Sequence, residues 1–508
     1  MNKQESKIFK FILPTFGNII WMAAFFGVLI RGRRMMNADG DLARHLALGR
    51  YILDTQRAPL RDVFSHTMTG EAMTPHEWIT QVLFAFAERI FDYEGVILLC
   101  ALVISTTIWL VFKHIRGEIQ AIIPTVLVAI LVLLSSMVHW LARPHIFTFL
   151  MLACWMMILD QLRMGHSKHW WILPLIMLLW ANLHGAFIAG FVTWIIYGIG
   201  TYWDALLQTK KNDPNLPVNF WRNYFFGGVT SFAVTLINPS GFNLWKTSVG
   251  YLGNRYLVDR TIEYQSPNFH DVKFWPFLIL IGILVIILGF SKRKPTSARL
   301  LNAAAWLMMG LYSARNIPLF AIVSAPLLAQ SFEDWMTNSF NEVKIFERIK
   351  DSDFRLRELN EQLKGYFWPL VSVIIAVAVL SLGINIDLDR KGYGFDPDVF
   401  PVEAVDWLKE NPQEGEMFNY FSWGGYLLYR LWPQEKVFID AQTDFYGENL
   451  TRQYADVIFT EDGWQNVLEK YSVTWAILPV NEPCVDAFKS ELGWHAIYMD
   501  DTAVILRR

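Results

Sequence analysis

The sequence predicts a polytopic α-helical membrane protein that carries a C-terminal extracytoplasmic α/β domain. Three observations lead to this prediction. Of the 508 residues, 53% are hydrophobic and only 18% are charged, which is too apolar for a soluble multidomain protein of this length. Apolar stretches long enough, or nearly long enough, to cross about 30 Å of hydrocarbon recur along the chain. The formal charge is about +9 before residue 387 and about −12 from there on, where the hydropathy also falls.

Eleven apolar segments are predicted to cross the membrane, although several are short and have less sharply defined ends. The first segment lacks a small-residue cleavage site and is followed by many others, so we expect it to be retained as a membrane span. The approximate bounds of the eleven segments are 12–30, 94–112, 121–138, 146–161, 170–183, 186–203, 224–238, 274–290, 299–313, 316–331 and 366–384.

Lysines and arginines in the short loops predict the orientation, because cytoplasmic loops are enriched in these residues. With a cytoplasmic N-terminus, every second loop is basic, whereas the short outer turns hold single basic residues or none. An odd number of spans then places the C-terminal domain outside, in what we expect to be a bacterial inner membrane. The basic residues on the predicted cytoplasmic side are Lys3, Lys7, Lys10, Lys113, Arg116, Arg163, Lys168, Lys210, Lys211, Arg222, Lys292, Arg293, Lys294 and Arg299, with six more in 332–365.

Two domains are predicted. Residues 1–386 form the transmembrane domain, with long outer loops at 31–77 and 239–273. The first loop contains seven arginines on the side where few are expected, which indicates an anionic partner such as a lipid phosphate. Residues 387–508 alternate short apolar strands (KVFID, TWAIL, TAVIL) with helical stretches such as PVEAVDWLKEN, a pattern typical of a small α/β domain.

Polar and ionisable residues gather on the predicted outer side. Such groups are costly next to hydrocarbon, so their concentration at one depth indicates a site. Asp41 and His45 are four residues apart in the predicted helix DLARHLALGRYIL, so both side chains could meet one proton or cation. The set at this depth comprises Asp39, Asp41, His45, His76, Glu77, His139, Arg143, His145, Asn182, His184, Glu263 and Arg315.

Structural alternatives exist for most of these residues. Asp39 could cap the helix that begins near Asp41. The pair His76–Glu77 could begin an interfacial helix anchored by Trp78, His184 could pack in a helix turn, and Arg143 could extend towards lipid headgroups.

A metal site formed by histidines is a further alternative. His45, His76, His145 and His184 could supply nitrogen ligands for zinc or manganese, although their spacing matches no compact metal motif. Asp440 and Asp444 in FIDAQTDFYG could serve turn and cap chemistry, or could contact a sugar or an acceptor.

Four stretches, in order along the chain, resemble the oligosaccharyltransferase catalytic subunits and the wider GT-C superfamily of membrane glycosyltransferases. NADGDLARH lies in the first outer loop, where that superfamily keeps its essential acidic residue. RTIEYQSPN is similar to the Thr-Ile-x-Glu loop motif. SARNIPLFAIVSAPLLA is similar to the arginine-containing outer end of a late span. VDWLKEN and FNYFSWGGYLLYRLWPQEKVFID resemble the start of the external C-terminal domain.

This resemblance implies a GT-C-like fold and a glycosyltransferase that moves a sugar from a polyprenyl-phosphate-linked donor to an extracytoplasmic protein, glycan or lipid. By match, Asp41 or Asp39 would act as base or metal ligand, with Glu263 as the second carboxylate. Arg315, helped by Arg143, would bind the donor phosphate, and a divalent metal, Mg²⁺ or Mn²⁺, is the implied cofactor. Acceptor-binding or supporting roles fall to His45, His76, Glu77, His145, His184, Trp423 and Tyr426.

The sequence departs from the family pattern at two places. HWLARPH holds no carboxylate where the family has its second acidic pair, which puts a metal held in the oligosaccharyltransferase manner in question. Gly424 and Gly425 stand where the acceptor motif Trp-Trp-Asp-Tyr-Gly has its aspartate, so recognition of asparagine sequons is not implied.

A different class of function also fits the layout, namely a non-enzymatic transporter or an assembly scaffold with an external recruitment domain. A transporter would place polar residues near the bilayer midplane on interrupted helices and would show repeat symmetry, and neither feature is clear here. No basic segment with interleaved aromatic residues indicates a nucleic-acid partner.

Overall fold

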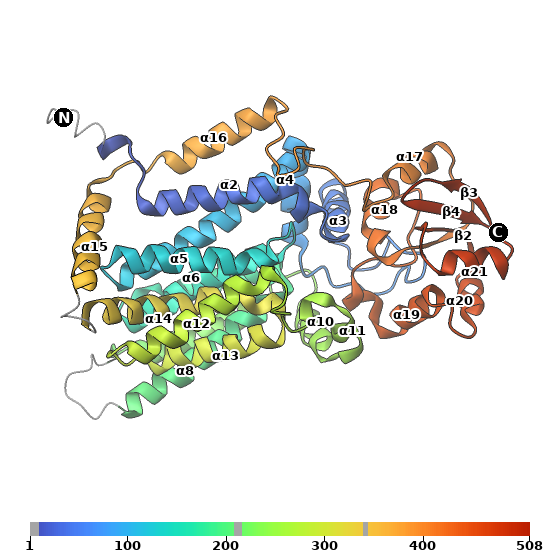
Figure 1. The fold of residues 1–508 in the computed structure, drawn as a ribbon. Coiled ribbons are helices and arrows are strands. Elements are labelled where there is room, and N and C mark those ends of the chain that lie inside the picture. Colours follow the sequence, from blue (N-terminus) through green and yellow to red (C-terminus); the bar gives the residue numbers. More distant parts are fainter. Residues whose placement is uncertain (1–9, 208–215, 339–343) are drawn as a thin grey trace.

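The computed structural model describes residues 10–207, 216–338 and 344–508. A bundle of long helices forms one part of the molecule, and a small sheet with surrounding helices forms the other (Figure 1). Four of the basic residues used to predict the orientation, Lys3, Lys7, Lys210 and Lys211, lie outside the described residues.

Each of the eleven predicted apolar segments overlaps an α-helix. Within the described residues, five stretches are long and apolar enough to cross a membrane, namely 78–118, 122–139, 145–163, 185–207 and 272–290. The number of crossings therefore stays a prediction. The helices that overlap the predicted segments are α2 (Phe16–Met36), α4 (Trp78–Glu118), α5 (Ile122–Ser136), α6 (His145–Arg163), α7 (Ile172–Leu183), α8 (Ile188–Leu207), α9 (Phe220–Val234), α12 (Trp275–Phe290), α13 (Ser297–Tyr312), α14 (Ile317–Asn338) and α16 (Trp368–Ser381).

The outer surface of the helical bundle is strongly apolar. On α12, for example, Val285 and Ile286 are more than half exposed, whereas Leu280 and Leu284 on the same helix are buried against the bundle. A helix that is apolar on its exposed face as well as its buried face is typical of contact with lipid chains.

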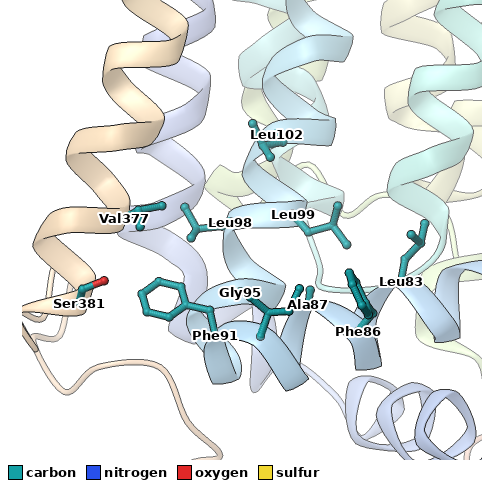
Figure 2. A pocket seen from close by; sticks show the side chains of 11 residues that line it. Leu83, Phe86, Ala87, Phe91, Gly95, Leu98, Leu99, Leu102, Val377 and Ser381 are labelled. Carbon is teal, nitrogen blue, oxygen red and sulfur yellow. The ribbon is translucent and has the colours of Figure 1, made fainter. Parts of the chain in front are cut away.

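A kink divides α4 into an outer arm and a long apolar span. Phe91 and Asp92 have non-helical backbone angles, and the predicted span beginning near residue 94 starts directly after them. The kink also borders an apolar groove of about 460 Å³ between α4 and α16, shown in Figure 2. The groove is lined by Leu83, Phe86, Ala87, Ile90, Phe91, Gly95, Leu98, Leu99, Leu102, Val377 and Ser381. No charged residue lines it, so it is distinct from the polar site described below.

The first outer loop connects the bundle to the C-terminal part. Its helix α3 (Asp41–Thr55) packs on both α4 and α18 (Gly424–Leu431), and Figure 1 shows it at the end of the bundle next to the C-terminal helices. Arg50 of α3 makes an ion pair with Glu88 of α4 (Nε to Oε2, 2.9 Å) and donates to the hydroxyl of Tyr429 on α18 (3.0 Å). These contacts fix the loop between the two parts of the molecule.

Small residues allow α18 to approach α3 closely. A Cβ atom on Gly425 would lie 2.5 Å from the carbonyl oxygen of Gly40, and one on Gly40 would overlap the carbonyl oxygen of Ser422. Gly425 therefore has a packing role beside the turn that holds Asp39 and Asp41, and Gly424 packs against the backbone of Ile439 and Asp440.

The C-terminal sheet has the strand order β1-β2-β4-β3. Strand β1 (Glu416–Asn419) runs parallel to β2 (Val473–Pro479), whereas β4 (Ala503–Arg507) is antiparallel to both β2 and β3 (His495–Met499). The strand predictions for TWAIL and TAVIL are confirmed in β2 and β4, as is the helix predicted for PVEAVDWLKEN, which is α17 (Val402–Glu410).

The strand prediction for KVFID is wrong. These residues form only one bridge, between Val437 and Ser65. The side chain of Asn419 takes the place of a neighbouring strand, because its Oδ1 accepts the N–H of Phe438 and its Nδ2 donates to the carbonyl of Ile439, both at 2.8 Å. An apolar pattern of five residues cannot reveal a side chain that satisfies the backbone in this way.

The remaining helices surround the sheet or connect parts of the bundle. They are α10 (Asn243–Gly253), α11 (Arg255–Arg260), α15 (Lys344–Gln362), α19 (Thr443–Ile458), α20 (Trp464–Lys470) and α21 (Cys484–Ser490). One hydrophobic core of the C-terminal part contains Ala43, Leu48 and Phe64 of the first outer loop together with Trp475 and Ile477 of β2. The first outer loop and the sheet thus share a core, and independent folding of 387–508 stays a prediction.

The close approach of α18 to α3 predicts the effect of Gly425→Ala. The added methyl group would meet the backbone of Gly40, so we expect a loss of about 1–3 kcal/mol in the free energy of unfolding. Chemical unfolding of the detergent-solubilised protein measures it. The control is Gly250→Ala in α10, where an added Cβ has no neighbour within 4 Å and the stability should rise by up to about 1 kcal/mol. Equal stability of the two variants would contradict the packing argument.

Candidate functional site

Arg143 lies among three carboxylates that come from distant segments. It follows η1 (Met137–His139) in the turn before α6, and its Nη1 is 3.2 Å from Oδ2 of Asp39. The same guanidinium also contacts the carboxylates of Asp41, at the start of α3, and of Glu263, in η4 (Ile262–Tyr264). We refer to Asp39, Asp41, Arg143 and Glu263 as the Arg143 cluster. Asp39 and Glu263 are 104 and 120 residues from Arg143 in sequence.

Local hydrogen bonds position each member of the Arg143 cluster. Asp39 accepts the N–H of Asp41 on its Oδ1 (3.0 Å), while its Oδ2 faces Arg143. The N-cap residue of α3 is Gly40, so the alternative in which Asp39 is the N-cap is wrong. The turn that carries Arg143 is tied to the end of α2 because Ala142 donates its N–H to the carbonyl of Met35 (3.2 Å). Ser313 donates its hydroxyl to the carbonyl of Glu263 (3.1 Å) and so ties η4 to the end of α13.

The Arg143 cluster remains open to solvent. The exposed fractions of the side chains are 32% for Asp39, 14% for Asp41, 22% for Arg143 and 21% for Glu263. Three carboxylates face a single guanidinium, so the cluster has an excess of negative charge when all three are ionised and can take up a proton.

Arg315 adds a second cation beside this cluster. It lies in η6 (Ala314–Asn316) with its guanidinium 4.4 Å from the ring centroid of Tyr264, the residue after Glu263. Within the described part of the chain, Arg315 forms no ion pair with a carboxylate. Its charge is therefore available to an anionic ligand, and a guanidinium suits phosphate through its planar arrangement of donors.

The two principal carboxylates are held in different protonation states. Burial raises the pKa of Asp41 to about 7, an effect that Arg143 opposes and the neighbouring Asp39 reinforces. For Glu263, burial would also raise the pKa, but Arg143 and Arg315 together hold it below its ordinary value. Near neutral pH, Asp41 can therefore exchange a proton while Glu263 stays ionised, a separation typical of acid–base sites.

The carboxylates do not fit the Mg²⁺ or Mn²⁺ ion that the family resemblance implies. Hard divalent ions need several oxygen ligands around one point. Here the oxygens of Asp39, Asp41 and Glu263 point at the guanidinium of Arg143, which supplies the positive charge at that point. A dication at the same place would be repelled by Arg143, so we derive no chemical step from a metal at these residues.

The predicted histidines divide into two groups. His45, His76 and His184 all lie around Glu77, with nitrogen-to-oxygen distances of 3.6–3.8 Å. His145 instead places its Nε2 2.8 Å from the carbonyl oxygen of His139, and the two rings are 4.1 Å apart.

Trp78 and Asn182 have structural partners. The indole N–H of Trp78 donates to Oδ1 of Asn182 (2.8 Å), and Nδ2 of Asn182 donates to the carbonyl of Ile237 (2.9 Å). These bonds join the start of α4 to the end of α7, so the indole N–H of Trp78 is directed into the protein.

Trp423 and Tyr426 are not brought to the Arg143 cluster. Both are buried in the core shared by the first outer loop and the sheet, where the indole N–H of Trp423 donates to the carbonyl of Val399 (2.9 Å). The hydroxyl of Tyr426 accepts from Arg430 (2.7 Å). Their contact with an acceptor stays a prediction, and it requires these buried rings to be uncovered.

The sequence argument missed the role of Arg44. This residue is buried, its Nε lies 3.3 Å from Oδ1 of Asp440, and its guanidinium also contacts Gln442. The signal was its position three residues after Asp41, which puts it on a neighbouring part of the same helical face. This ion pair connects α3 to FIDAQTDFYG, and Asp444 of that segment lies 3.6 Å from His76.

The fold is similar to that of solved archaeal oligosaccharyltransferases, the proteins that the sequence motifs resemble. The apo oligosaccharyltransferase of Archaeoglobus fulgidus is 13% identical to this chain with a TM-score of 0.55, and the match covers 91% of this chain and 69% of that one. AglB from the same organism, in complex with an inhibitory peptide and a dolichol-phosphate, gives 12% identity and a TM-score of 0.54 with the same coverage.

Other comparisons add little to this result. ArnT from Cupriavidus metallidurans bound to undecaprenyl phosphate is 12% identical over 96% of this chain and 97% of that one, but its TM-score of 0.47 is too low to support an argument. No family model matches the chain, and no curated protein matches it by sequence. The apolar helices and the shared fold identify an integral membrane protein.

The Arg143 cluster predicts the effect of Arg143→Met. Three carboxylates would lose their counter-charge, so we expect the free energy of unfolding to fall by about 3 kcal/mol at pH 8. The loss should shrink as the pH falls towards 5, because protonation of the carboxylates removes their mutual repulsion. Unfolding curves at both pH values measure this.

The matched control is Arg34→Met, which removes an exposed ion pair with Asp389. We expect the loss in this variant to be much smaller than in Arg143→Met, because solvent screens an exposed ion pair. A loss of the same size in both variants, or one independent of pH for Arg143→Met, would show that Arg143 does not balance the carboxylates.

Proposed function

We propose that this protein is a membrane glycosyltransferase that moves a sugar from a polyprenyl-phosphate-linked donor to an acceptor on the extracytoplasmic side. The observation that carries the proposal is the Arg143 cluster beside Arg315, at one end of a bundle with the GT-C fold. In AglB, a neighbour in fold, a dolichol-phosphate and a peptide are bound, which supports a lipid-linked donor here.

The chemistry of such a transfer explains why cations and a carboxylate are needed together. The acceptor's nucleophilic atom attacks C1 of the sugar, and the C1–O bond to the donor phosphate breaks. The electron pair of that bond passes to the phosphate oxygen, so the leaving group gains negative charge. Arg315 lies where it would bind this phosphate and stabilise the charge as it develops.

Asp41 is the proposed base. It takes the proton that the acceptor loses, and its pKa of about 7 suits this task near neutral pH. Glu263 stays ionised and would orient the acceptor by accepting a hydrogen bond. Arg143 holds both carboxylates in place and is therefore a positioning residue for Asp41 and Glu263.

The acceptor is proposed to be a protein, a glycan or a lipid at the outer surface of a bacterial inner membrane. Gly424 and Gly425 stand where the resemblance would place the acceptor-motif aspartate. Gly424 packs against Ile439 and Asp440, and Gly425 packs against Gly40 and Arg44. This supports an acceptor different from the asparagine sequon. The orientation, with the N-terminus in the cytoplasm and residues 387–508 outside, is part of the same proposal.

The proposal predicts that Asp41→Asn abolishes the base. We expect the rate of transfer from a polyprenyl-phosphate-linked sugar to fall by about 100-fold or more, since general-base catalysis contributes about 10² to 10⁴. The assay measures the loss of label from a polyprenyl-phosphate-linked sugar, separated from the product by chromatography, in membranes that contain the variant. Asp54→Asn is the matched control, because Asp54 lies on the same helix and is largely exposed. Unchanged transfer by a correctly inserted Asp41→Asn protein would remove Asp41 from the mechanism.

The pKa of Asp41 predicts the dependence of the rate on pH. Because the base works only when ionised, the rate should fall about tenfold per pH unit below pH 7. The groups that act on Asp41 are Arg143 and Arg44, which favour its ionised form, and Asp39 and Glu263, which disfavour it. Asp39→Asn should therefore lower the pKa of Asp41 and move the fall to lower pH. A fall near pH 4, or a shift in the other direction, would contradict the assignment.

A further inference from the structure

We propose that Glu77, His45, His76 and His184 form a binding site for one divalent transition metal ion of the zinc type. This Glu77 site is distinct from the Arg143 cluster, and it goes beyond the proposed transfer reaction. Its residues come from α3, from the segment before α4 and from the turn after α7.

Three imidazole nitrogens surround the carboxylate of Glu77. Oε1 lies 3.6 Å from Nε2 of His184 and 3.8 Å from Nε2 of His76, and Oε2 lies 3.8 Å from Nδ1 of His45. These distances are longer than the roughly 2.7–3.2 Å of a hydrogen bond. Two ligands of a tetrahedral zinc ion are about 3.4 Å apart. The histidine nitrogens around Glu77 are more widely spaced, since no three of these four residues have ligand atoms within 4.8 Å of one another, so a bound ion would have to draw the imidazoles together around the carboxylate.

The far nitrogens of two histidines are held as they are in metal sites. Nδ1 of His76 lies 3.1 Å from the carbonyl oxygen of Thr74, which can only accept, so Nδ1 carries the proton and Nε2 is left free. Nδ1 of His184 lies 2.8 Å from the hydroxyl oxygen of Thr148. A hydrogen bond on the second nitrogen fixes the ring and directs the other nitrogen to the metal.

The buried side chain of His45 gives independent support for a metal ion at this site. Only 3% of its surface is exposed, and its Nδ1, which faces Glu77, has no hydrogen-bond partner among the described residues. A buried nitrogen without a hydrogen-bond partner destabilises the fold. A metal ion between His45 and Glu77 would use this nitrogen as a ligand.

The surroundings of Glu77 differ from those of the other acidic groups. Within the described residues, Glu77 forms ion pairs with histidines alone, whereas the Arg143 cluster contains a guanidinium. Imidazole nitrogens with one carboxylate favour zinc and related ions over Mg²⁺, which prefers oxygen ligands.

A tighter group of possible ligands occurs at the other end of the bundle, but it is already occupied. His114, Glu118 and Asp160 place their ligand atoms within 4.8 Å of one another. There, Nη2 of Arg299 lies 2.9 Å from Glu118 and 2.8 Å from Asp160, and Asp160 also bonds to His114. This guanidinium fills the position that a metal would need, so we do not assign a metal to that group.

The test uses the purified full-length protein after removal of bound metal with a chelator. Titration with Co²⁺, followed by its visible absorption bands, and competition with Zn²⁺ should show one tight site per chain. We expect Glu77→Gln and His184→Ala each to weaken binding about 100-fold or more. Thr148→Val should weaken it about 10- to 100-fold, since it removes the hydrogen bond that holds His184.

Two controls make the result specific. His270→Ala removes an exposed histidine, and His114→Gln changes the group occupied by Arg299, so neither should alter metal binding. Thermal unfolding of the metal-free variants shows whether each is folded, and His45→Ala replaces any variant that is not. The inference is overturned if the stripped protein binds no metal, if binding survives Glu77→Gln, or if His114→Gln abolishes it. Because the measured quantity is metal binding, this outcome is independent of whether the protein transfers sugar.

Discussion

The outer face of this protein depends on one guanidinium that holds three carboxylates together. Without Arg143, the charges of Asp39, Asp41 and Glu263 would repel one another in a partly buried space. Arginine suits this position because its five donors lie in one plane and its charge does not change with pH. The contacts of this one side chain thus join residues 31–77, the turn before α6 and the loop before α12.

An arginine also pairs with more than one carboxylate at the opposite end of the helices, but there the ion pairs are buried. Arg299 bridges Glu118 and Asp160, and the exposed fractions of its side chain and that of Asp160 are 6% and 2%. Arg143 and Glu263 keep more than a fifth of their side-chain surface exposed. Because the ion pairs of Arg299 are buried, they connect helices. Because the Arg143 cluster is partly exposed, its side chains can contact a ligand. Exposure, rather than the residue types, separates a candidate site from a structural ion pair.

Much of the architecture could be predicted from the sequence, because the pattern of apolar residues shows which segments are buried or in contact with lipid. All eleven apolar segments are helical, and the strands containing Trp475 and Val504 were identified from short apolar patterns. The segment ending at Asp440 was assigned wrongly, because its backbone is satisfied by the side chain of Asn419, and no local pattern encodes that contact. Prediction succeeded where burial decides the structure and failed where a distant polar group does.

The residues of the candidate site could be predicted from the sequence, but the ion pairs between them could not. Asp41, Glu263 and Arg315 were selected by their predicted depth and by motif resemblance, and the structure brings them to one region. A phosphate-binding or headgroup role was predicted for Arg143, yet its guanidinium pairs with carboxylates more than 100 residues away in sequence. Such pairing depends on how loops meet after the helices pack, and single-residue properties do not carry that information.

The C-terminal part is built into the site, and this has a consequence for how an acceptor would arrive. Gly425 packs on the backbone of Gly40, next to Asp39 and Asp41, and Arg44 in the following turn is paired with buried Asp440. A displacement of α18 or of the segment near Asp440 would therefore move the acidic turn itself. If the proposed transfer takes place here, the shared core would fix the position of an acceptor bound to the C-terminal part relative to Asp41. The same packing that stabilises the fold would then set the geometry of the proposed transfer.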